Sequence, residues 1–337
     1  MIEPISGISI VIPVYNEELN VVASYREVRG VLDCFGRPYE IIFVDDGSRD
    51  KTLENLLAVG GSDPALRIVQ LRRNFGQTAA MAAGFEYARY DGVVALDGDL
   101  QNDPNEIPKM IAKLEEGYDL VAGWRKKRQD RWLSRKLPSR CANWLISKVT
   151  GVKLHDYGCT LKAMRSEIAK GINLYGEMHR FIPALANEVG ARIAEVPVNH
   201  RPRLFGKTKY GISRTIRVFL DLITVKFLLR YSKRPIHLFG VLGLVSFAAG
   251  LLAIAHTTYQ RFFMAIPMGN RPLFVLGVMM VLVGLQFLVF GLLAEVLART
   301  YHESQDRRIF AVRRVYERFP NVEPMTVPVN SVWRRSA

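Results

Sequence analysis

The sequence has little cysteine and lacks the common nucleotide-binding loops. Its three cysteines, Cys34, Cys141 and Cys159, form no C-x-x-C pair, which fits a reducing compartment and offers no metal framework. Neither G-x-G-x-x-G nor G-x-x-x-x-G-K-[ST] occurs, which argues against a dinucleotide-dependent dehydrogenase or a P-loop ATPase. We expect no signal peptide, because the apolar stretch Ile8–Ile12 is short and stops at Pro13.

Charged residues are absent from the two longest apolar runs. Ile236–Tyr259 and Leu273–Leu293 contain no Lys, Arg, Asp or Glu. Each run is close to the ~20 residues that a helix needs to cross the ~30 Å hydrocarbon core of a bilayer. Buried core helices are the alternative, although soluble folds rarely hold such long charge-free runs. The runs predict a hairpin of two transmembrane helices.

Basic residues surround this hairpin. The chain has 46 Lys and Arg against 32 Asp and Glu, a net charge of +14, which would attract nucleic acid, anionic lipid or phosphate-bearing substrates. Because both flanks of the hairpin are rich in Arg and Lys, the positive-inside rule predicts that the N-terminal region and both termini are cytosolic. The predicted division is a soluble-type domain (1–211), an interfacial amphipathic helix (212–234), two transmembrane helices (235–298) and a basic cytosolic tail (299–337).

Two of these segments have alternative interpretations. The amphipathic segment 212–234 could also be an ordinary helix packed on the domain. In the tail, Arg308–Tyr316 alternates weakly and predicts a short strand, which could pair with a neighbouring subunit of a homo-oligomer; a disordered tail is the alternative.

Apolar, β-branched runs alternate with helical patterns through the first 125 residues, which predicts an α/β fold with a mainly parallel sheet. The expected strands are Ile8–Ile12, Glu40–Val44, Arg67–Leu71, Gly92–Leu96 and Leu120–Gly123. The expected helices are Glu18–Cys34, Thr52–Ala58, Thr78–Ala88 and Asn105–Glu116. Ligands of such sheets bind beyond the carboxyl ends of the strands. Acidic clusters follow three of these strands, at 13–17, 45–48 and 97–99.

The last of these clusters, Asp97-Gly98-Asp99, predicts a metal site. Two carboxylates so close together repel each other, and a hard divalent cation relieves that repulsion. With Gln101 two residues further on, the oxygen-rich set favours Mg²⁺ or Mn²⁺. Such a cation would offset the charge on a departing diphosphate.

Several ordered segments resemble a known enzyme family. IVIPVYNEELN, FVDDGSRDKT, LRRNFGQTAAMAAG and ALDGDLQNDP look like family 2 glycosyltransferases of the GT-A fold. HDYGCTLKAMR, YGEMHRFIPAL and HRPRLFGKTKYG are similar to dolichol-phosphate mannosyltransferases and bacterial polyprenyl-phosphate glycosyltransferases. The resemblance covers roughly residues 7–230. It implies a Rossmann-like catalytic domain that transfers a sugar from a nucleotide-sugar to polyprenyl phosphate at the inner membrane.

The resemblance also assigns roles to individual residues. The donor site would comprise Pro13, Tyr15, Glu17, Val44, Asp46, Asp97, Gly98 and Asp99, with Arg203 and Lys209 closing over the diphosphate. The metal would be held by Asp97, Asp99 and Gln101, and the lipid phosphate by Arg125, Arg135 and Ser139. Of these, Asp97, Asp99, Arg125 and Arg135 would be catalytic. Arg suits a phosphate because its fork binds two oxygens at once.

The basic run Arg125–Arg140 also has a nucleic-acid interpretation, because its eight basic residues could neutralise phosphates. Apart from Trp132 it lacks aromatic residues to stack on bases, and it precedes a membrane anchor, so no nucleic-acid partner is expected. Membrane lipids are the expected surface partner instead.

A phosphate acceptor, with a second pKa near ~6, is already ionised at neutral pH and needs no strong general base. We therefore expect direct displacement with inversion. Asp156 remains open as a base, a sugar ligand or a loop support, and Glu177, His179 and Arg180 are equally open.

UDP-glucose is the first expectation for the donor, because the two spans resemble the bacterial glucosyl-transfer subgroup; GDP-mannose and UDP-linked amino sugars stay open. A processive synthase would show Q-x-x-R-W and more spans, and both are absent from the sequence. Loss of one aspartate of D-x-D would have favoured a catalytically silent scaffold of the same fold, but both aspartates are present.

Overall fold

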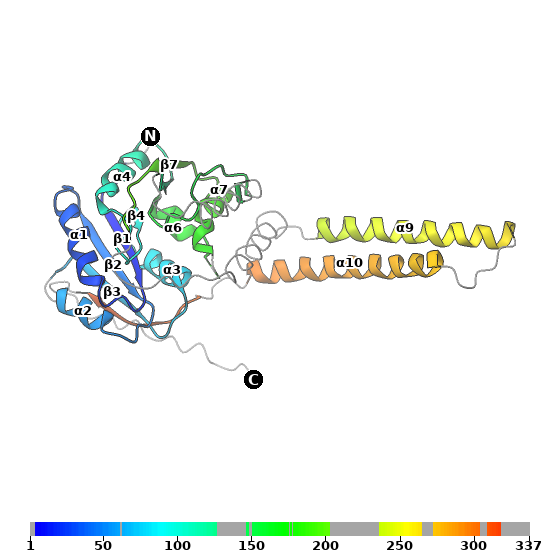
Figure 1. Cartoon of the computed structure of the whole chain (residues 1–337), viewed down its shortest axis with the longest axis horizontal. Coiled ribbons are helices and arrows are strands. Elements are labelled where there is room, and N and C mark those ends of the chain that lie inside the picture. Colours follow the sequence, from blue (N-terminus) through cyan, green and yellow to red (C-terminus); the bar gives the residue numbers. More distant parts are fainter. Residues whose placement is uncertain are drawn as a thin grey trace. The chain divides into compact units, whose positions relative to one another are not determined.

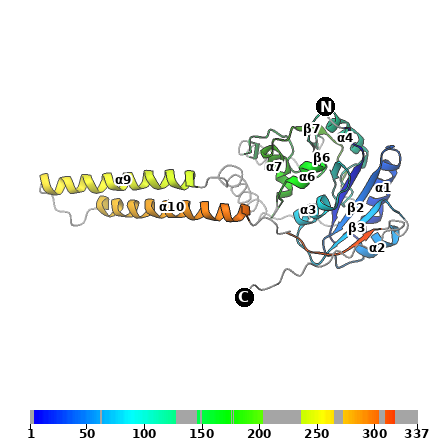
Figure 2. The same cartoon turned by 180° about the vertical axis from the view of Figure 1, so that it is seen from behind.

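The chain forms two compact units, which we describe separately. The computed structural model describes residues 4–60, 63–126, 146–147, 150–174, 176, 178–202, 236–264, 272–303 and 309–317. The sheet unit comprises Met1–Gly211 and Arg308–Ala337, and the helix unit comprises Ile212–Arg307. The sheet unit is thus built from both ends of the sequence. Figures 1 and 2 show the two units from opposite sides.

Within the described residues, eight strands form one sheet in the order β7-β5-β6-β4-β1-β2-β3-β8. The strands are β1 (Ile8–Val14), β2 (Tyr39–Asp45), β3 (Leu66–Leu71), β4 (Gly92–Ala95), β5 (Leu120–Trp124), β6 (Lys162–Arg165), β7 (Ile193–Pro197) and β8 (Val312–Glu317). β1 pairs in parallel with β2 and β4, β2 with β3, and β5 with β7. β6 and β8 run antiparallel to their neighbours. The predicted α/β fold with a mainly parallel sheet is therefore confirmed.

Three helices cover one face of this sheet: α1 (Val21–Asp33), α2 (Thr52–Val59) and α4 (Ile107–Glu115). Alternate residues of β1, Ile8, Ile10 and Ile12, share a buried cluster with apolar side chains of all three helices. A strand presents every second side chain to the same face, so this half of β1 fixes which helices pack there.

The opposite face of β1 and β2 packs against α3 (Gln77–Tyr87). Gly84 makes this close approach possible, because an added Cβ would lie 2.1 Å from Val11 Cγ1 and 3.2 Å from Val44 Cγ2. Val11 and Val44 are fully buried beneath the helix. α6 (Ser166–Gly171) also contacts α3, and the 3₁₀ helix η3 (Met178–Phe181) leads into α7 (Ile182–Glu188) (Figure 2).

β8 completes the sheet although it follows the helix unit in the sequence. It pairs antiparallel with β3, with Arg67 opposite Glu317 and Leu71 opposite Val312. The predicted tail strand is thus present, but it pairs within its own chain rather than with a neighbouring subunit. The unpaired edge of β3 supplies the backbone donors and acceptors for this pairing.

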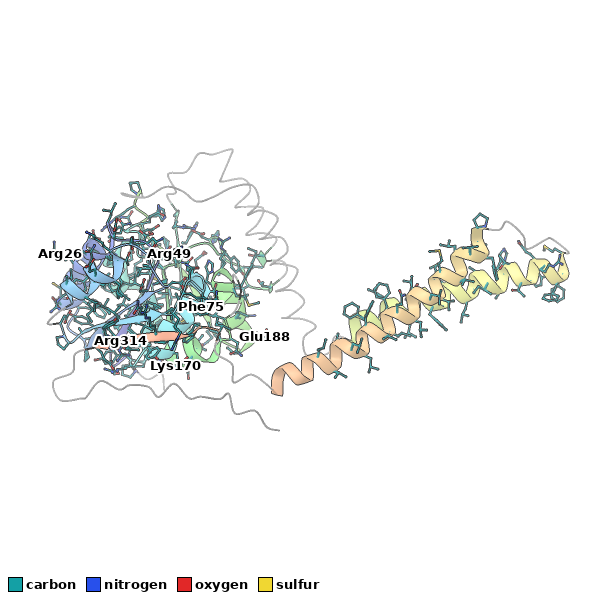
Figure 3. All side chains as sticks on the ribbon, turned by 90° about the horizontal axis from the view of Figure 1, so that it is seen from below. Arg26, Arg49, Phe75, Lys170, Glu188 and Arg314 are labelled. Carbon is teal, nitrogen blue, oxygen red and sulfur yellow. The ribbon has the colours of Figure 1, made fainter. Side chains whose placement is uncertain are left out.

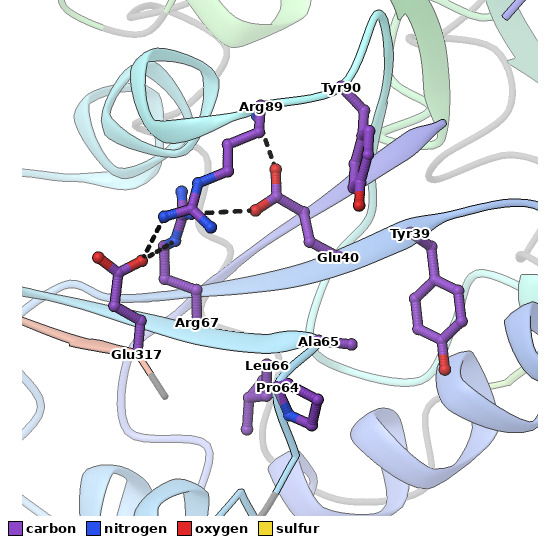
Figure 4. A pocket seen from close by; sticks show the side chains of 9 residues that line it. All are labelled: Tyr39, Glu40, Pro64, Ala65, Leu66, Arg67, Arg89, Tyr90 and Glu317. Atoms are coloured by element: carbon purple, nitrogen blue, oxygen red, sulfur yellow. Dashed lines mark hydrogen bonds and ion pairs between the residues drawn. The ribbon is translucent and has the colours of Figure 1, made fainter. Parts of the chain in front are cut away.

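A buried ionic group fastens the end of β8. Figure 4 shows Arg67 between two carboxylates, with Nε 2.9 Å from Glu317 Oε2 and Nη2 3.3 Å from Glu40 Oε2. Arg89 Nη2 reaches the same Glu317 oxygen at 2.8 Å. The Arg67 and Glu40 side chains are 5% and 7% exposed, so each depends on the other for compensation of its charge.

The helix unit holds α9 (Ile236–Phe263) and α10 (Pro272–Glu303). Within them, Phe239–Phe263 and Pro272–Ala294 are long and apolar enough to cross a membrane, and only 11% of either segment's most apolar stretch is buried. Their side chains project outward in Figure 3, as expected for helices that face lipid. The predicted interfacial helix at 212–234 lies outside the described residues.

Glycines line the seam between these two helices. A Cβ added to Gly243 would lie 2.8 Å from Gly284 O, and one added to Gly250 would lie 2.7 Å from Gly277 O. Ser246 Oγ donates to the carbonyl of Met280 across the same seam, at 2.8 Å. Small residues let helix backbones approach closely where no hydrophobic force between helices operates.

Candidate active site

Strand direction gathers the chemically informative residues at one edge of the sheet. β1 and β2 end together, with Val14 opposite Asp45, and β4 ends at Ala95 beside Val11. β5 runs in the same direction as β4, since both are antiparallel to β6, and Arg125 follows its last residue. The aspartate clusters and Arg125 therefore meet at the carboxyl edge, where sheets of this kind bind ligands.

Two aspartates at the end of β2 support the surrounding loops. Asp45 Oδ1 accepts from Ser48 N at 3.0 Å, and the two oxygens of Asp46 accept from Phe75 N at 2.7 Å and Gly76 N at 2.9 Å. Burial raises the pKa of both carboxyls, and these hydrogen bonds partly offset that rise. Asp46, which the resemblance places in the donor site, holds the loop before α3 through these hydrogen bonds. Asp45 Oδ2 is buried without a hydrogen-bond partner among the described residues.

Gly47 lets these two loops touch. Its φ is +69°, and an added Cβ would lie 2.6 Å from the carbonyl carbon of Arg73. Next to that contact, the Arg73 guanidinium lies 4.3 Å from the centre of the Phe75 ring (labelled in Figure 3). Any other residue at Gly47 would push apart the loops that follow β2 and β3.

Asp97 is held from two sides in the turn after β4. Gln77 Nε2, at the start of α3, donates to Asp97 Oδ1 at 2.7 Å, and the Thr160 hydroxyl donates to Oδ2. Asp99 Oδ1 accepts from Gln101 N at 3.1 Å. Burial, followed by the charge of Asp99, raises the pKa of Asp97 to about 6. The two carboxylates thus form a pair that a cation would stabilise in its ionised form.

The donor set fits a divalent cation that also binds a substrate phosphate. Among the described residues no group of three His, Cys, Asp or Glu side chains is close enough to hold a metal by itself. Mg²⁺ commonly binds through one or two carboxylates and completes its shell with phosphate oxygens and water. Asp97 and Asp99 could supply those two carboxylates.

Two hydrogen bonds to Asp156 fix the side chain of Arg125. Arg125 Nε donates to Asp156 Oδ2 at 2.6 Å and Nη2 donates to Oδ1 at 2.9 Å, so the pair is bidentate. The side chains are only 13% and 5% exposed. Burial acts to lower the pKa of Arg125, but the hydrogen bonds and charge of Asp156 raise it overall. Both oxygens of Asp156 are engaged, which favours loop and side-chain support over the role of a base.

Glu195 on β7 holds the backbone that carries Asp156. Its carboxylate accepts from the main-chain N–H groups of His155 and Asp156, at 2.9 and 3.0 Å, and contacts His155 Nδ1 at 2.7 Å. The His155 ring stacks on Trp124, with centroids 4.3 Å apart. Trp124, which precedes Arg125, and the backbone of Asp156 are therefore held by packing as well as by charge.

Sequence reasoning missed a buried lysine near the same edge. Lys162 is 3% exposed, donates to the Cys159 carbonyl and lies between Ala95 and Ala122 of the two neighbouring strands. Burial lowers the pKa of Lys162, against the charges of Cys159, Asp156 and Asp97. The sequence shows only a single Lys in the TLKAMR segment. The alternation of apolar and polar residues in a strand does not indicate a role for it.

His179 is a half-buried polar residue whose role the sequence left open. Its Nδ1 lies 2.9 Å from Thr78 Oγ1 on α3. Burial, with the charges of Arg180 and Lys162, lowers the pKa of His179 to about 3, so the ring is neutral at physiological pH. His179 thus packs η3 against α3 as an uncharged hydrogen-bonding group.

The predicted donor residues take different places. Pro13, near the end of β1, and Tyr15 and Glu17, in the loop after it, are half-buried. Val44 is fully buried under α3 and presents no surface to a ligand. Gly98 is buried against Val14, since an added Cβ would lie 2.6 Å from Val14 Cγ1. Four predicted residues lie outside the described part of the chain: Arg135, Ser139, Arg203 and Lys209.

The chain is similar to known proteins over nearly its whole length. The family model described as "Glycosyl transferase family 2" matches residues 9–172. The dodecaprenyl-phosphate galacturonate synthase of Rhizobium johnstonii is 46% identical over 329 residues, 94% of this chain and 97% of that protein. The undecaprenyl-phosphate 4-deoxy-4-formamido-L-arabinose transferase of Pseudomonas aeruginosa is 39% identical, over 95% of this chain and 94% of that protein. The chain therefore belongs to glycosyltransferase family 2 and is a glycosyltransferase.

Solved structures agree on the fold. Glucosyl-3-phosphoglycerate synthase from Mycobacterium tuberculosis, in complex with Mn²⁺ and UDP-glucose, superimposes with a TM-score of 0.52 at 18% identity, over 66% of this chain and 79% of that chain. The likeness confirms the GT-A fold of the sheet unit.

Proposed function

We propose that this enzyme transfers a sugar from a nucleotide-sugar to the phosphate of a polyprenyl lipid. One observation carries the proposal: the Asp97–Asp99 pair and the buried Arg125 lie at the same carboxyl edge of the sheet. The relatives above, which match nearly the full chain, are named for sugar transfer involving dodecaprenyl and undecaprenyl phosphate. Both the site and the relatives thus support one reaction class.

On the donor side, Asp97, Asp99 and Gln101 would hold Mg²⁺ or Mn²⁺, with the donor diphosphate completing its shell. When bound, the cation would stabilise the negative charge that grows on the leaving nucleoside diphosphate. The nucleoside would lie against the loop after β1, near Tyr15 and Glu17. Arg203 and Lys209 stay predictions for the diphosphate.

On the acceptor side, Arg125 is the described candidate for the lipid phosphate, together with the predicted Arg135 and Ser139. The Arg125 guanidinium is bound to Asp156 through Nε and Nη2, so Nη1 takes no part in this pair. Asp156 fixes the guanidinium before the lipid arrives, which removes the entropy cost of ordering it.

The reaction then needs little more than positioning. A phosphomonoester oxygen is ionised at neutral pH, so it can attack the anomeric carbon directly and invert its configuration. One carbon–oxygen bond forms to the lipid phosphate while the bond to the nucleoside diphosphate breaks, and no proton must be removed. The engagement of both Asp156 oxygens supports a mechanism without a general base.

The pairing of β8 with β3 supports the proposed topology. β3 precedes the two apolar helices and β8 follows them, yet both strands belong to one sheet. If the helices cross a membrane, the start of α9 and the end of α10 must therefore lie on the same side. Two crossings satisfy this condition. Together with the positive-inside rule, this favours a catalytic domain on the cytosolic face.

The sugar is a finer part of the proposal. UDP-glucose was expected from the two-span architecture. A galacturonyl donor has stronger support, because the relative that is 46% identical is named for galacturonate. A catalytically silent scaffold has no such support, since Asp97, Asp99 and Arg125 are all present.

The test is transfer by the detergent-purified protein with undecaprenyl phosphate, Mn²⁺ or Mg²⁺, and a panel of donors. The panel holds UDP-galacturonate, UDP-glucose, GDP-mannose and UDP-4-deoxy-4-formamido-arabinose, with lipid-linked sugar detected by mass spectrometry. A product from one donor that requires metal and is lost in Asp99→Asn supports the proposal. Folded protein that forms no product with any donor and binds no UDP or GDP would contradict it.

A further inference from the structure

Leu100 lies in the middle of the loop that follows β4, residues 97–103, which we call the acidic loop. Its backbone conformation is unfavourable. Its φ is +62°, in the left-handed region that residues other than Gly, Asn and Asp rarely adopt. The side chain is also buried, with 5% exposure, so the residue cannot relax into solvent. Such conformations persist only where the surrounding structure imposes them. Leu100 directly follows Asp99, so the same restraint fixes the proposed metal loop.

A second segment of chain supplies that restraint. On one side of Leu100, Asp99 Oδ1 accepts from Gln101 N at 3.1 Å. On the other side, Gln101 O accepts from Arg201 N at 2.9 Å, and Asn102 and His200 form an isolated antiparallel bridge. The acidic loop is therefore joined through its backbone to the residues that follow β7.

Side chains hold this second segment in turn. The Arg201 guanidinium donates through Nη2 to Asp103 Oδ1 at 2.8 Å and through Nη1 to Glu27 Oε2, on α1, at 2.7 Å. Asn199 Nδ2 donates to the other Asp103 oxygen at 3.1 Å, and Asn199 N donates to Glu106 Oε1 at 3.0 Å. Asp103, whose side chain is 12% exposed, is the shared acceptor. Arg201 thus connects α1, the acidic loop and the end of β7.

We propose that Arg201 is a positioning residue for the donor site. It holds the acidic loop in the conformation that keeps Asp97, Asp99 and Gln101 close together. Arg201 itself does not contact the sugar. The inference rests on the proposed function, because it takes that loop to bind a divalent cation and a nucleoside diphosphate. It differs from the predicted roles of Arg203 and Lys209, which would contact the diphosphate themselves.

The first test compares Arg201→Met and Arg201→Lys with a control in the full-length, detergent-purified enzyme. Calorimetry measures UDP binding in the presence of Mn²⁺ without acceptor, and transfer assays give KM for each substrate. We expect Arg201→Met to weaken UDP–Mn²⁺ binding by roughly 10-fold or more while KM for the lipid is unchanged. Arg201→Lys should recover part of the loss, since an ammonium can reach one of the two carboxylates. Arg192→Met, at a side chain that is 60% exposed, is the charge-matched control and should bind normally.

The second test asks whether Arg201 acts through the strained loop. Leu100→Gly, which tolerates a positive φ, is introduced into the wild type and into Arg201→Met. If both residues maintain one restraint, the loss of UDP–Mn²⁺ affinity in the double variant is smaller than the product of the two single losses.

A loss of UDP–Mn²⁺ affinity in the double variant equal to the product of the two single losses would overturn the proposal, since Arg201 would then act independently of the acidic loop. Unchanged binding in Arg201→Met, with an active wild type, would also overturn it. A wild type that neither binds UDP–Mn²⁺ nor transfers any sugar would overturn the proposed function and this inference with it.

Discussion

Replacing Asp156 by Asn separates two roles that a carboxylate at this position could have. In the structure Asp156 is a bidentate partner of Arg125, and the side chains are 5% and 13% exposed. Removing one member of a buried pair leaves the other charge uncompensated and costs about 3–5 kcal/mol. Asn keeps one acceptor oxygen, so we expect a loss near the lower end, about 3 kcal/mol.

Thermal unfolding of the purified enzyme measures this loss. For a domain of about 200 residues, 1 kcal/mol corresponds to about 2–4 °C, so Asp156→Asn should lower Tm by about 6–12 °C. The control is Glu116→Gln, which removes the same charge from a surface pair with Lys113 at a side chain that is 56% exposed. Such exposed pairs contribute about 0–1 kcal/mol, so the control should unfold nearly as the wild type does.

Transfer kinetics provide the second measurement. If Asp156 positions Arg125, Asp156→Asn raises KM for the lipid phosphate, keeps measurable kcat and leaves KM for the donor unchanged. If Asp156 were a general base, the variant would keep its Tm and lose kcat at every lipid concentration. That second pattern would refute the assignment of Asp156 as a support for Arg125.

Three further predictions concern other parts of the fold. Glu317→Gln removes the carboxylate that Arg67 contacts at 2.9 Å and should destabilise the sheet unit by about 1–3 kcal/mol in thermal unfolding; an unchanged Tm would mean that β8 does not fasten the sheet. Burial lowers the pKa of His179 to about 3 from its ordinary 6.5, so the unfolded chain binds one more proton between these values. Stability from this group is therefore complete above about pH 6.5 and falls by about 1.4 kcal/mol per unit on acidification; His179→Gln should flatten that slope in urea titrations, and an equal slope in both proteins would contradict it. Gly250→Leu should part α9 and α10 and lower Tm in detergent, because a Cβ there lies 2.7 Å from a carbonyl oxygen, whereas Leu252→Ala, at an outward position, should not.

The sequence predicted the half of the sheet that obeys a regular pattern. Apolar runs of four to seven residues mark β1 to β5, and each lies within about two residues of its expected bounds. β6 and β7 were missed because charged residues interrupt them: Lys162 and Arg165 bound the first, and Glu195 lies in the second. Periodicity carries no information about a buried charge whose partners come from elsewhere in the chain.

The candidate site divides in the same way. Asp97 and Asp99 follow a clear strand and were found from their position alone. The partners that orient them were not, because Gln77 and Thr160 approach from segments 20 and 63 residues away. The role of Asp156 depended on the same kind of long-range contact, since only the structure shows it paired with Arg125.

β8 imposes an order on the biosynthesis of this enzyme. The ribosome completes β1 to β7 and then both apolar helices before it reaches Val312, so β3 leaves the ribosome with an open edge. An open edge is a template for unwanted strand pairing until its own partner arrives. The sheet can close only after both apolar helices have been synthesised, so a chain arrested before Val312 would lack its last strand. Completion of the catalytic domain is thereby linked in time to the synthesis of the two apolar helices.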